Sequence, residues 1–208
     1  MIVFDVEQAS ELWFQARCGI PTASEFDKII TAGGKYSTQS VEYKNRLLSE
    51  IITGKPHISF KNDAMQRGNE LEQEAADYYE LIRGVDCEKQ GFCTNDAGTY
   101  GCSVDRLIGD KGLLEIKCPL PKTMVGYMLN EDSLRKDYWV QVQGQLLVTG
   151  RDWCDLLAYC PEMPPIIIRI ERNTRFIMDL VAALAKFDQE MARDKKELIA
   201  KGYIKTKE

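Results

Sequence analysis

The spacing of apolar residues predicts helices in the first part of the chain. Apolar positions three and four residues apart, separated by polar ones, recur over about 10–17, 39–52 and 64–83. The first of these helices would begin at Ser10 and turn Leu12, Trp13 and Ala16 inward. The pattern therefore predicts helices ahead of the sheet.

A further helix is predicted between the first two, in "PTASEFDKIITAGG". Thr22 is followed three residues later by Glu25, which is the spacing of a capping box. Gly33 and Gly34 would end this helix, because glycine readily adopts the conformation that closes a helix.

The second half of the chain predicts strands alternating with helices. Strands are expected over about 86–94, 99–108 and 113–118, the last two joined by the turn "GDKG". A helix in "DYWVQVQGQLLVTG", strands in "WCDLLAYC" and "PIIIRIE", and a helix over about 174–201 follow. This order predicts one domain over residues 1–208, of the α/β class, with a mixed central β-sheet flanked by helices.

Composition agrees with an ordinary globular protein, since 44% of the 208 residues are hydrophobic and 28% are charged. No apolar run approaches the roughly 20 residues that a membrane-spanning helix needs. The first residues, "MIVFDVEQAS", lack the basic and apolar regions of a signal peptide, so a cytoplasmic location is expected. The net charge of -5 argues against a basic coat for nucleic acid, but it leaves room for a local basic channel.

Cysteine and histidine exclude several kinds of site. The seven cysteines show no CxxC spacing and leave one over if paired, so reduced core residues are expected rather than a disulfide frame or a zinc knuckle. With His57 as the single histidine, a Ser/His/Asp triad or a histidine-rich metal site is disfavoured.

The stretch "GLLEIKCPLP" carries candidate chemistry. Glu115 and Lys117 lie two residues apart in a strand and therefore share a face. The turn "GDKG" makes a hairpin that brings Asp105 near them. Two carboxylates, with the backbone carbonyl of Ile116, suit Mg²⁺, which usually takes one or two protein carboxylates and keeps positions for water and phosphate. The alternative is an exposed edge strand with a surface charge pair.

The same group of residues suits phosphodiester hydrolysis. Lys117 would orient or deprotonate a metal-bound water and offset charge on the attacked phosphate. Glu72, on the helix of "GNELEQEA", would contact the metal directly or through water. The alternative is that Glu70, Glu72 and Glu74 form a solvated helix face.

Two other groups of polar residues fit such a site. Arg17 and Ser24 flank the start of the helix predicted from Thr22, where free N–H groups favour an anion, so they predict a phosphate pocket; a cap with a surface arginine is the alternative. Gln141 and Gln145 share a helix face at i, i+4 spacing, which suggests work on a phosphate or water. Solvent exposure is the simpler explanation for Gln143.

Five motifs, in this order and spacing, resemble the phage lambda exonuclease family, also called YqaJ-like viral recombinases. They are "ELWFQARCGIPTASEF", "RGNELEQEA", "GCSVDRLIG", "LLEIKCP" and "YWVQVQGQLLVTG", and the resemblance covers roughly residues 6–160. That family belongs to the PD-(D/E)xK nuclease superfamily. The resemblance thus implies a restriction-endonuclease-like core.

Roles for individual residues follow from the resemblance. It implies that Asp105 and Glu115 bind Mg²⁺, that Lys117 is the catalytic lysine, and that Glu72 and Gln141 complete the site. It also implies that Arg17 and Ser24 hold a phosphate near the 5′ end of the digested strand. Met65 falls where the family places an apolar wedge that parts the two strands, although an ordinary core methionine at a helix start is the alternative.

One part of the sequence departs from the family. Proline usually precedes the metal aspartate and glycine follows it, whereas Val104 and Arg106 occupy these positions here. Arg106 alternates away from Asp105 on a strand, so it is expected to meet the DNA backbone or a neighbouring subunit.

The resemblance further implies a ring-shaped homotrimer that threads double-stranded DNA and degrades one strand 5′ to 3′. The remaining 3′ overhang would pass to a single-strand annealing protein in recombination, in the cytoplasm of a host carrying a phage or prophage. The expected activity is a processive Mg²⁺-dependent exonuclease, with two ions per site and Mn²⁺ as a substitute. Two alternatives stay open: an endonuclease of the same fold, and a nonenzymatic DNA-end binding protein.

Overall fold

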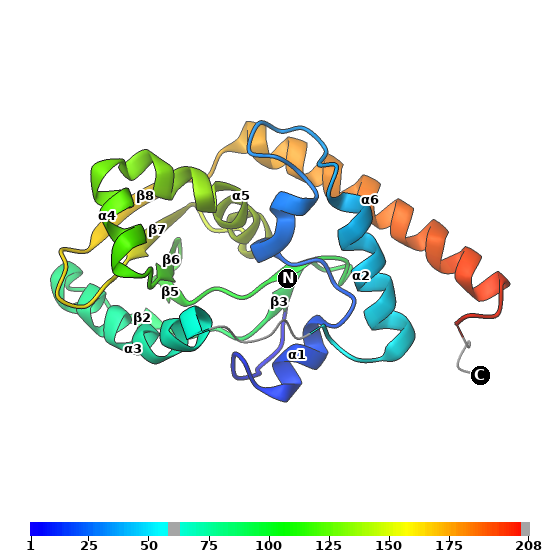
Figure 1. The fold of residues 1–208 in the computed structure, drawn as a ribbon, viewed down its shortest axis with the longest axis horizontal. Helices are drawn as coiled ribbons and strands as arrows, with labels where there is room; N and C mark the ends of the chain where they lie inside the picture. Colours follow the sequence, from blue (N-terminus) through cyan, green and yellow to red (C-terminus); the bar gives the residue numbers. More distant parts are fainter. Residues whose placement is uncertain (58–62, 205–208) are drawn as a thin grey trace.

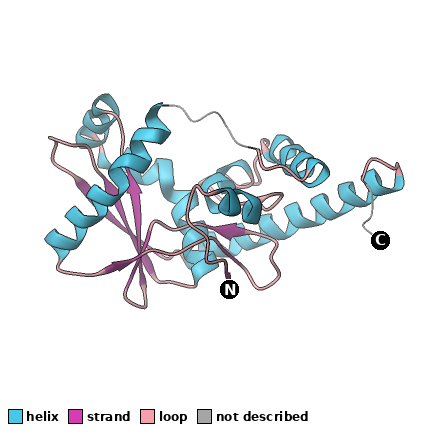
Figure 2. Cartoon of the chain, turned by 90° about the horizontal axis from the view of Figure 1, so that it is seen from below, coloured by secondary structure: helices cyan, strands magenta, loops and turns pink. Residues whose placement is uncertain are grey.

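A five-stranded mixed sheet lies toward the end of the molecule away from the C-terminus in the computed structural model, which describes residues 1–57 and 63–204 (Figures 1 and 2). Its strands, in spatial order, are β2 Cys87–Glu88, β5 Arg106–Ile108, β6 Gly112–Lys117, β7 Trp153–Ala158 and β8 Ile166–Glu171. Within this sheet β6 and β7 run parallel, and the other neighbouring pairs are antiparallel. The prediction of an α/β fold with a mixed sheet flanked by helices is confirmed.

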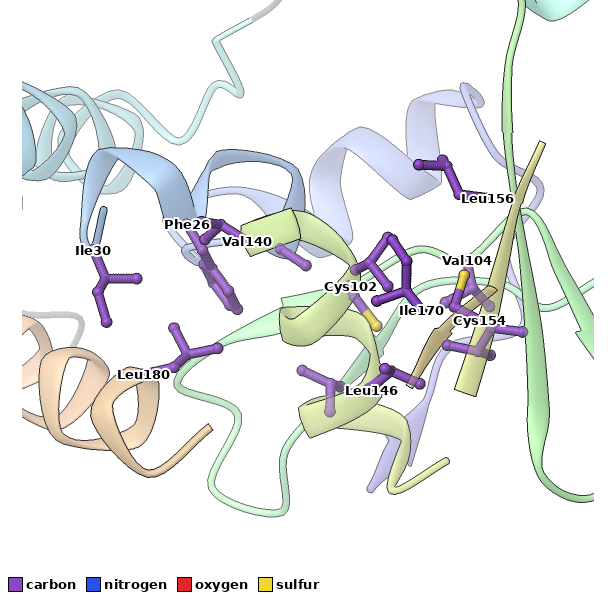
Figure 3. Close-up of a cluster of buried hydrophobic side chains, with 14 of the residues drawn as sticks. Phe26, Ile30, Cys102, Val104, Val140, Leu146, Cys154, Leu156, Ile170 and Leu180 are labelled. Carbon is purple, nitrogen blue, oxygen red and sulfur yellow. The ribbon is translucent and has the colours of Figure 1, made fainter. Parts of the chain in front are cut away.

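Helices cover both faces of this sheet (Figure 1). Their bounds are α1 Glu11–Arg17, α2 Ser40–Thr53, α3 Asp63–Arg83, α4 Pro121–Leu129, α5 Glu131–Thr149 and α6 Thr174–Ala200. On one face Leu114 and Ile116 pack against Ala75 and Tyr79 of α3. On the other face Leu113 belongs to the larger core, which α5, α2 and α6 share. Figure 3 shows part of this core, including Leu146 of α5 and Leu180 of α6. The side chains of β6 therefore alternate between two covered faces, as a strand requires.

The crossover from β6 to β7 differs from the prediction. The helix expected within 137–150 begins earlier, at Glu131, and α4 precedes it without having been predicted. Pro121 stands in the first turn of α4, where its missing N–H costs nothing. The helix is short and contains Gly126, so its apolar pattern is too brief to indicate a helix by itself.

The single strands predicted over 86–94 and 99–108 are wrong, because each divides between two sheets. A second, three-stranded sheet contains β1 Ile2–Val3, β3 Cys93–Thr94 and β4 Gly101–Cys102. The break between β2 and β3 contains Gly91, where an added Cβ would lie 2.1 Å from the carbonyl oxygen of Phe4. Contact with the N-terminal segment therefore redirects the chain at a point that local strand propensity does not reveal.

The helix predicted from Thr22 to Gly33 is also wrong. The segment forms a short 3₁₀ helix, η1, over Ala23–Lys28, and the side chain of Thr22 does not cap it. Glu25 forms ion pairs with Lys28 and with Arg46 of α2 instead of closing a capping box. Phe26, with Ile29 and Ile30 just after η1, is completely buried, so tertiary packing determines this conformation.

Gly144 lets η1 lie close to α5. A Cβ added at Gly144 would lie 2.6 Å from the ring of Phe26, whereas one added at Gly126 of α4 would have no neighbour within 4 Å. We therefore expect Gly144→Ala to lower the free energy of unfolding by about 1–2 kcal/mol, since overpacking outweighs the gain in helix propensity.

Gly126→Ala is the matched control for this change. It should raise the free energy of unfolding by about 0.5–1 kcal/mol, because only the propensity term remains. Urea denaturation of both variants measures the two changes. A stabilised Gly144→Ala variant would contradict the close packing of η1 on α5.

Exposure of single side chains tests several smaller expectations. Leu12 was predicted to face inward but is 69% exposed, while Trp13 and Ala16 are half-buried.

All seven cysteines are free, and Cys93 and Cys102 lie opposite each other in the register of β3 and β4. Among the described residues no helix is long and apolar enough to cross a membrane.

Candidate active site

Asp105, Glu115 and Lys117 meet where β5 begins and β6 ends. Arg106 lies opposite Leu114 in the register of the hairpin, so Asp105 comes level with the second half of β6. The Oδ2 atom of Asp105 accepts a hydrogen bond of 2.7 Å from the backbone N–H of Ile116. The predicted hairpin therefore does bring these side chains together.

The carboxylate of Glu115 is the centre of the site and is 3% exposed. Its Oε1 atom lies 2.6 Å from Nζ of Lys117 and accepts a hydrogen bond of 2.5 Å from Nε2 of Gln141. Its Oε2 atom accepts a hydrogen bond of 2.6 Å from Nε2 of Gln145. Both oxygens of the buried carboxylate thus accept from donors. These contacts are needed because an unpaired charge is unfavourable in an environment of low dielectric constant.

Lys117 is held from three sides. Besides Glu115, its Nζ atom donates to Oε1 of Gln141 at 3.4 Å and lies 4.6 Å above the ring of Tyr138. Burial by itself lowers the pKa of Lys117, but the charges of Glu115 and Asp105 outweigh that effect and raise the pKa above its ordinary value. The residue is therefore an ammonium group, suited to offset negative charge.

The carboxyl of Asp105 is electrostatically strained. Burial and, second, the charge of Glu115 raise the pKa of its carboxyl well above the ordinary value, while Lys117 acts in the opposite direction. Two carboxylates close together, of which one resists ionisation, are a typical binding site for a divalent cation, because the cation stabilises both negative charges.

The oxygen atoms present fit Mg²⁺ with few protein ligands. Ile116 donates its N–H to Asp105, and because a residue's N–H and C=O point to the same side of a strand, its carbonyl also faces Asp105. Among residues 1–57 and 63–204, no group of three or more His, Cys, Asp or Glu side chains is placed to hold a metal. Two carboxylates and one carbonyl match Mg²⁺, which usually keeps several waters.

Glu72 lies beside this group but pairs with Arg106. Nη1 of Arg106 is 2.7 Å from Oε1 of Glu72 and donates to the carbonyl of Asp105 at 2.6 Å. Nη2 donates to Oε1 of Gln73 at 3.1 Å, and the side chain is only 4% exposed. The expectation that Arg106 meets DNA or a neighbouring subunit is therefore corrected: its guanidinium is buried between α3 and the carbonyl of Asp105, where it positions Glu72.

Arg17 and Ser24 come together through Thr22. The hydroxyl of Thr22 accepts a hydrogen bond of 3.1 Å from Nη2 of Arg17 and lies 3.3 Å from the hydroxyl of Ser24. The guanidinium of Arg17 also stacks on the ring of Trp13 at 3.9 Å. A cation and two hydroxyls thus form a small polar group, although the neighbouring helix is a 3₁₀ helix of six residues rather than a full α-helix.

Trp13 connects this polar group to the carboxylates. Its Nε1 donates a hydrogen bond of 2.8 Å to the hydroxyl of Ser103, which stands two residues before Asp105. Sequence reasoning assigned no site role to Trp13 or Ser103, because their contact joins residues 90 apart in the chain.

Of the three glutamines of α5, Gln141 and Gln145 were expected to act on a phosphate or water, and the resemblance placed Gln141 alone in the active site. Gln145 contacts Glu115 as closely as Gln141 does, and its i, i+4 spacing from Gln141 was the signal for it. The expected exposure of Gln143 is wrong, since the residue is fully buried and its amide binds the backbone of Glu171 and Asn173. Met65 lies in the first turn of α3, but its side chain is outside the described residues, so the wedge stays a prediction.

The chain is similar to a known protein family and to solved structures. A family model described as the YqaJ-like viral recombinase domain matches residues 12–152. The crystal structure of an alkaline exonuclease, LHK-Exo from Laribacter hongkongensis, is 32% identical in sequence and superimposes with a TM-score of 0.84. That match covers 93% of this chain and 98% of the other, and the same protein has also been solved in complex with dAMP.

A second solved structure is more distant. A phage related exonuclease from Haemophilus somnus 129PT is 18% identical, with a TM-score of 0.66 over 84% of this chain and 96% of that one, and at this identity the likeness shows the fold alone. No protein of curated function matches significantly.

Proposed function

Because the chain belongs to the YqaJ-like viral recombinase family, we propose that it is a Mg²⁺-dependent exonuclease that digests double-stranded DNA processively from its ends, 5′ to 3′. The observation that carries this proposal is the shared contact of Glu115 with Lys117 and Gln141 beside Asp105. The description of the relative LHK-Exo as an alkaline exonuclease supports the same role.

Each residue of the site has a task in hydrolysis. Asp105, Glu115 and the carbonyl of Ile116 would hold Mg²⁺, with two ions per site and Mn²⁺ as a substitute. Glu72 would contact the metal directly or through a water. Mg²⁺ supplies a water of lowered pKa and a polarised phosphoryl oxygen. Lys117 would offset negative charge on the attacked phosphate. Gln141 would hold the side chains of Lys117 and Glu115 in position relative to each other, since it forms a hydrogen bond with each.

The group formed by Arg17 and Ser24 would bind the terminal 5′ phosphate. A guanidinium and a hydroxyl are matched donors for a phosphate, and Thr22 and Trp13 hold the guanidinium in place. Recognition of the end phosphate would align the strand so that the next phosphodiester reaches Lys117. This arrangement favours an end-dependent nuclease over an internal cutter.

The family also leads us to propose an assembly and partners. A homotrimeric ring around the DNA would explain how a chain of net charge -5 stays bound, because only the channel needs to be basic. The 3′ overhang would be passed to a single-strand annealing protein in the cytoplasm of a host that carries a phage or prophage. Sedimentation at the mass of three chains would support the ring, and a monomer on DNA would contradict it.

The substrate dependence tests the proposed activity. Linear blunt duplex DNA with a 5′ phosphate, the same duplex with a 5′ hydroxyl, and a closed circle are incubated in Mg²⁺. We expect rapid conversion of the phosphorylated duplex to single strands, slower conversion of the hydroxyl duplex, and an intact circle. Cutting of the circle would indicate an endonuclease of the same fold, and binding without hydrolysis of any substrate would indicate a DNA-end binding protein.

A further inference from the structure

Gln145 contacts two oxygen atoms from the two chain segments that carry the carboxylates of the site. It lies in α5, is 1% exposed, and its Nε2 atom donates to Oε2 of Glu115 at 2.6 Å and to the carbonyl of Ser103 at 3.1 Å. Since both neighbours are acceptors, the amide must turn its NH₂ group toward them. The opposite orientation would place an amide oxygen against a carboxylate.

This amide ties the segment before β5 to β6. Ser103 stands two residues before Asp105, and its hydroxyl accepts from Trp13 while its carbonyl accepts from Gln145. Glu115 belongs to β6. Gln145 therefore fixes the distance between the backbone leading to one carboxylate and the side chain of the other.

The contact also decides how Glu115 is oriented. Gln145 occupies Oε2, which leaves Oε1 as the oxygen that faces Lys117 and Gln141. The last torsion angle of a glutamate has a broad energy minimum, so its orientation depends on such partners. Loss of the Gln145 donor would leave a buried oxygen of Glu115 without a partner and would favour rotation of the carboxylate.

The unused half of the Gln145 amide points to the same role. Its Oε1 atom is buried and has no hydrogen-bond partner among the described residues. If the side chain only filled space here, an apolar residue of similar size would give a more stable fold, because an unpaired buried oxygen is unfavourable. The position thus uses glutamine for its two N–H donors.

We propose that Gln145 is a positioning residue that fixes the orientation of the Glu115 carboxylate for cation binding and hydrolysis. This inference rests on the proposed nuclease function, and it adds a residue whose side-chain hydrogen bonds, among the residues that the structure describes, go to Ser103 and Glu115. Partners of this kind typically change metal affinity or activity by about 10- to 100-fold when they are removed.

Gln143 provides a matched control on the same helix. It is also fully buried, and its amide makes two hydrogen bonds, from Nε2 to the carbonyl of Glu171 and from the N–H of Asn173 to Oε1. Neither partner belongs to the candidate active site. Replacing Gln143 therefore removes the same chemical group from the same helix without touching Glu115.

The experiment compares Gln145→Met with Gln143→Met, because methionine keeps the length of the side chain and removes its donors. Three quantities are measured: Mn²⁺ affinity of the DNA-free protein, kcat and KM on linear 5′-phosphorylated duplex, and the midpoint of thermal unfolding. For Gln145→Met we expect kcat and Mn²⁺ affinity to fall about 10- to 100-fold, with KM for DNA within about threefold. For Gln143→Met we expect lower thermal stability with Mn²⁺ affinity near that of the unchanged protein.

The outcomes separate this inference from the proposed function. Unchanged Mn²⁺ affinity and kcat in folded Gln145→Met would overturn the inference, as would equal losses in the two variants. If Gln145→Met does not fold, Gln145→Asn takes its place. Asparagine keeps the amide, but its side chain is one methylene too short to reach Glu115. An Mn²⁺ affinity equal to that of the unchanged protein would again overturn the inference. If the unchanged protein digests no DNA, the proposed function fails, and the Mn²⁺ affinities still decide the role of Gln145.

Discussion

Replacing Lys117 with alanine is expected to slow DNA hydrolysis by on the order of 10²–10⁴-fold while leaving DNA binding intact. The ammonium group of Lys117 lies 2.6 Å from Oε1 of Glu115, and its charged form is favoured by Glu115 and Asp105. The variant loses the positive charge that would face the attacked phosphate. Glu115 keeps its contacts with Gln141 and Gln145, so the fold should survive.

Single-turnover rates on linear duplex in saturating Mg²⁺ measure this effect, and duplex binding in Ca²⁺ checks that substrate affinity is retained. Lys111→Ala is the control, because Lys111 is 75% exposed in the turn before β6 and should be dispensable. A Lys117→Ala variant that hydrolyses DNA within about threefold of the unchanged protein would remove Lys117 from the chemistry.

Replacing Asp105 with asparagine should abolish hydrolysis and, without divalent cations, should stabilise the fold. The pKa of the Asp105 carboxyl is raised by burial and by the charge of Glu115. A raised carboxyl pKa means that ionisation opposes folding. This destabilisation is absent below the pKa of the unfolded chain, grows as pH rises toward the folded pKa, and is complete above it. Asparagine removes it and still offers an oxygen to the N–H of Ile116.

Thermal unfolding in EDTA across the pH range measures this second prediction. Near pH 8 the variant should unfold at a higher temperature than the unchanged protein, by about 2–4 °C for each kcal/mol gained, and the difference should vanish near pH 4. Added Mg²⁺ should stabilise the unchanged protein and leave the variant unaffected. A variant that is less stable at pH 8 in EDTA would show that Asp105 is not electrostatically strained.

The sequence predicted the centre of the site because its geometry is local. Glu115 and Lys117 share a face by the two-residue period of a strand, and a short turn places Asp105 opposite them. Gln141 and Glu72 were proposed from their helix positions and assigned to the site by the resemblance, and α5 indeed brings Gln141 to Glu115. A hairpin and a helix thus provide much of the site from features within about 40 residues of one another.

Features that depend on distant packing were not predictable. Arg106 follows the alternation of its strand, but only α3 determines that its guanidinium is buried against Glu72 rather than exposed. The 3₁₀ conformation after Thr22 depends on the close approach of Phe26 to Gly144, more than 100 residues later. The contact between Trp13 and Ser103 likewise has no local signal.

The direction of digestion tests the central claim most directly. A linear duplex with 5′ phosphates, carrying one label at the 5′ end and another at the 3′ end of the same strand, is digested in Mg²⁺ and sampled early. Digestion from the 5′ end predicts that the 5′ label is released at once as mononucleotide, while the 3′ label stays on long fragments and the product exposes 3′ single strands. Early release of the 3′ label, or internal fragments carrying either label, would contradict it.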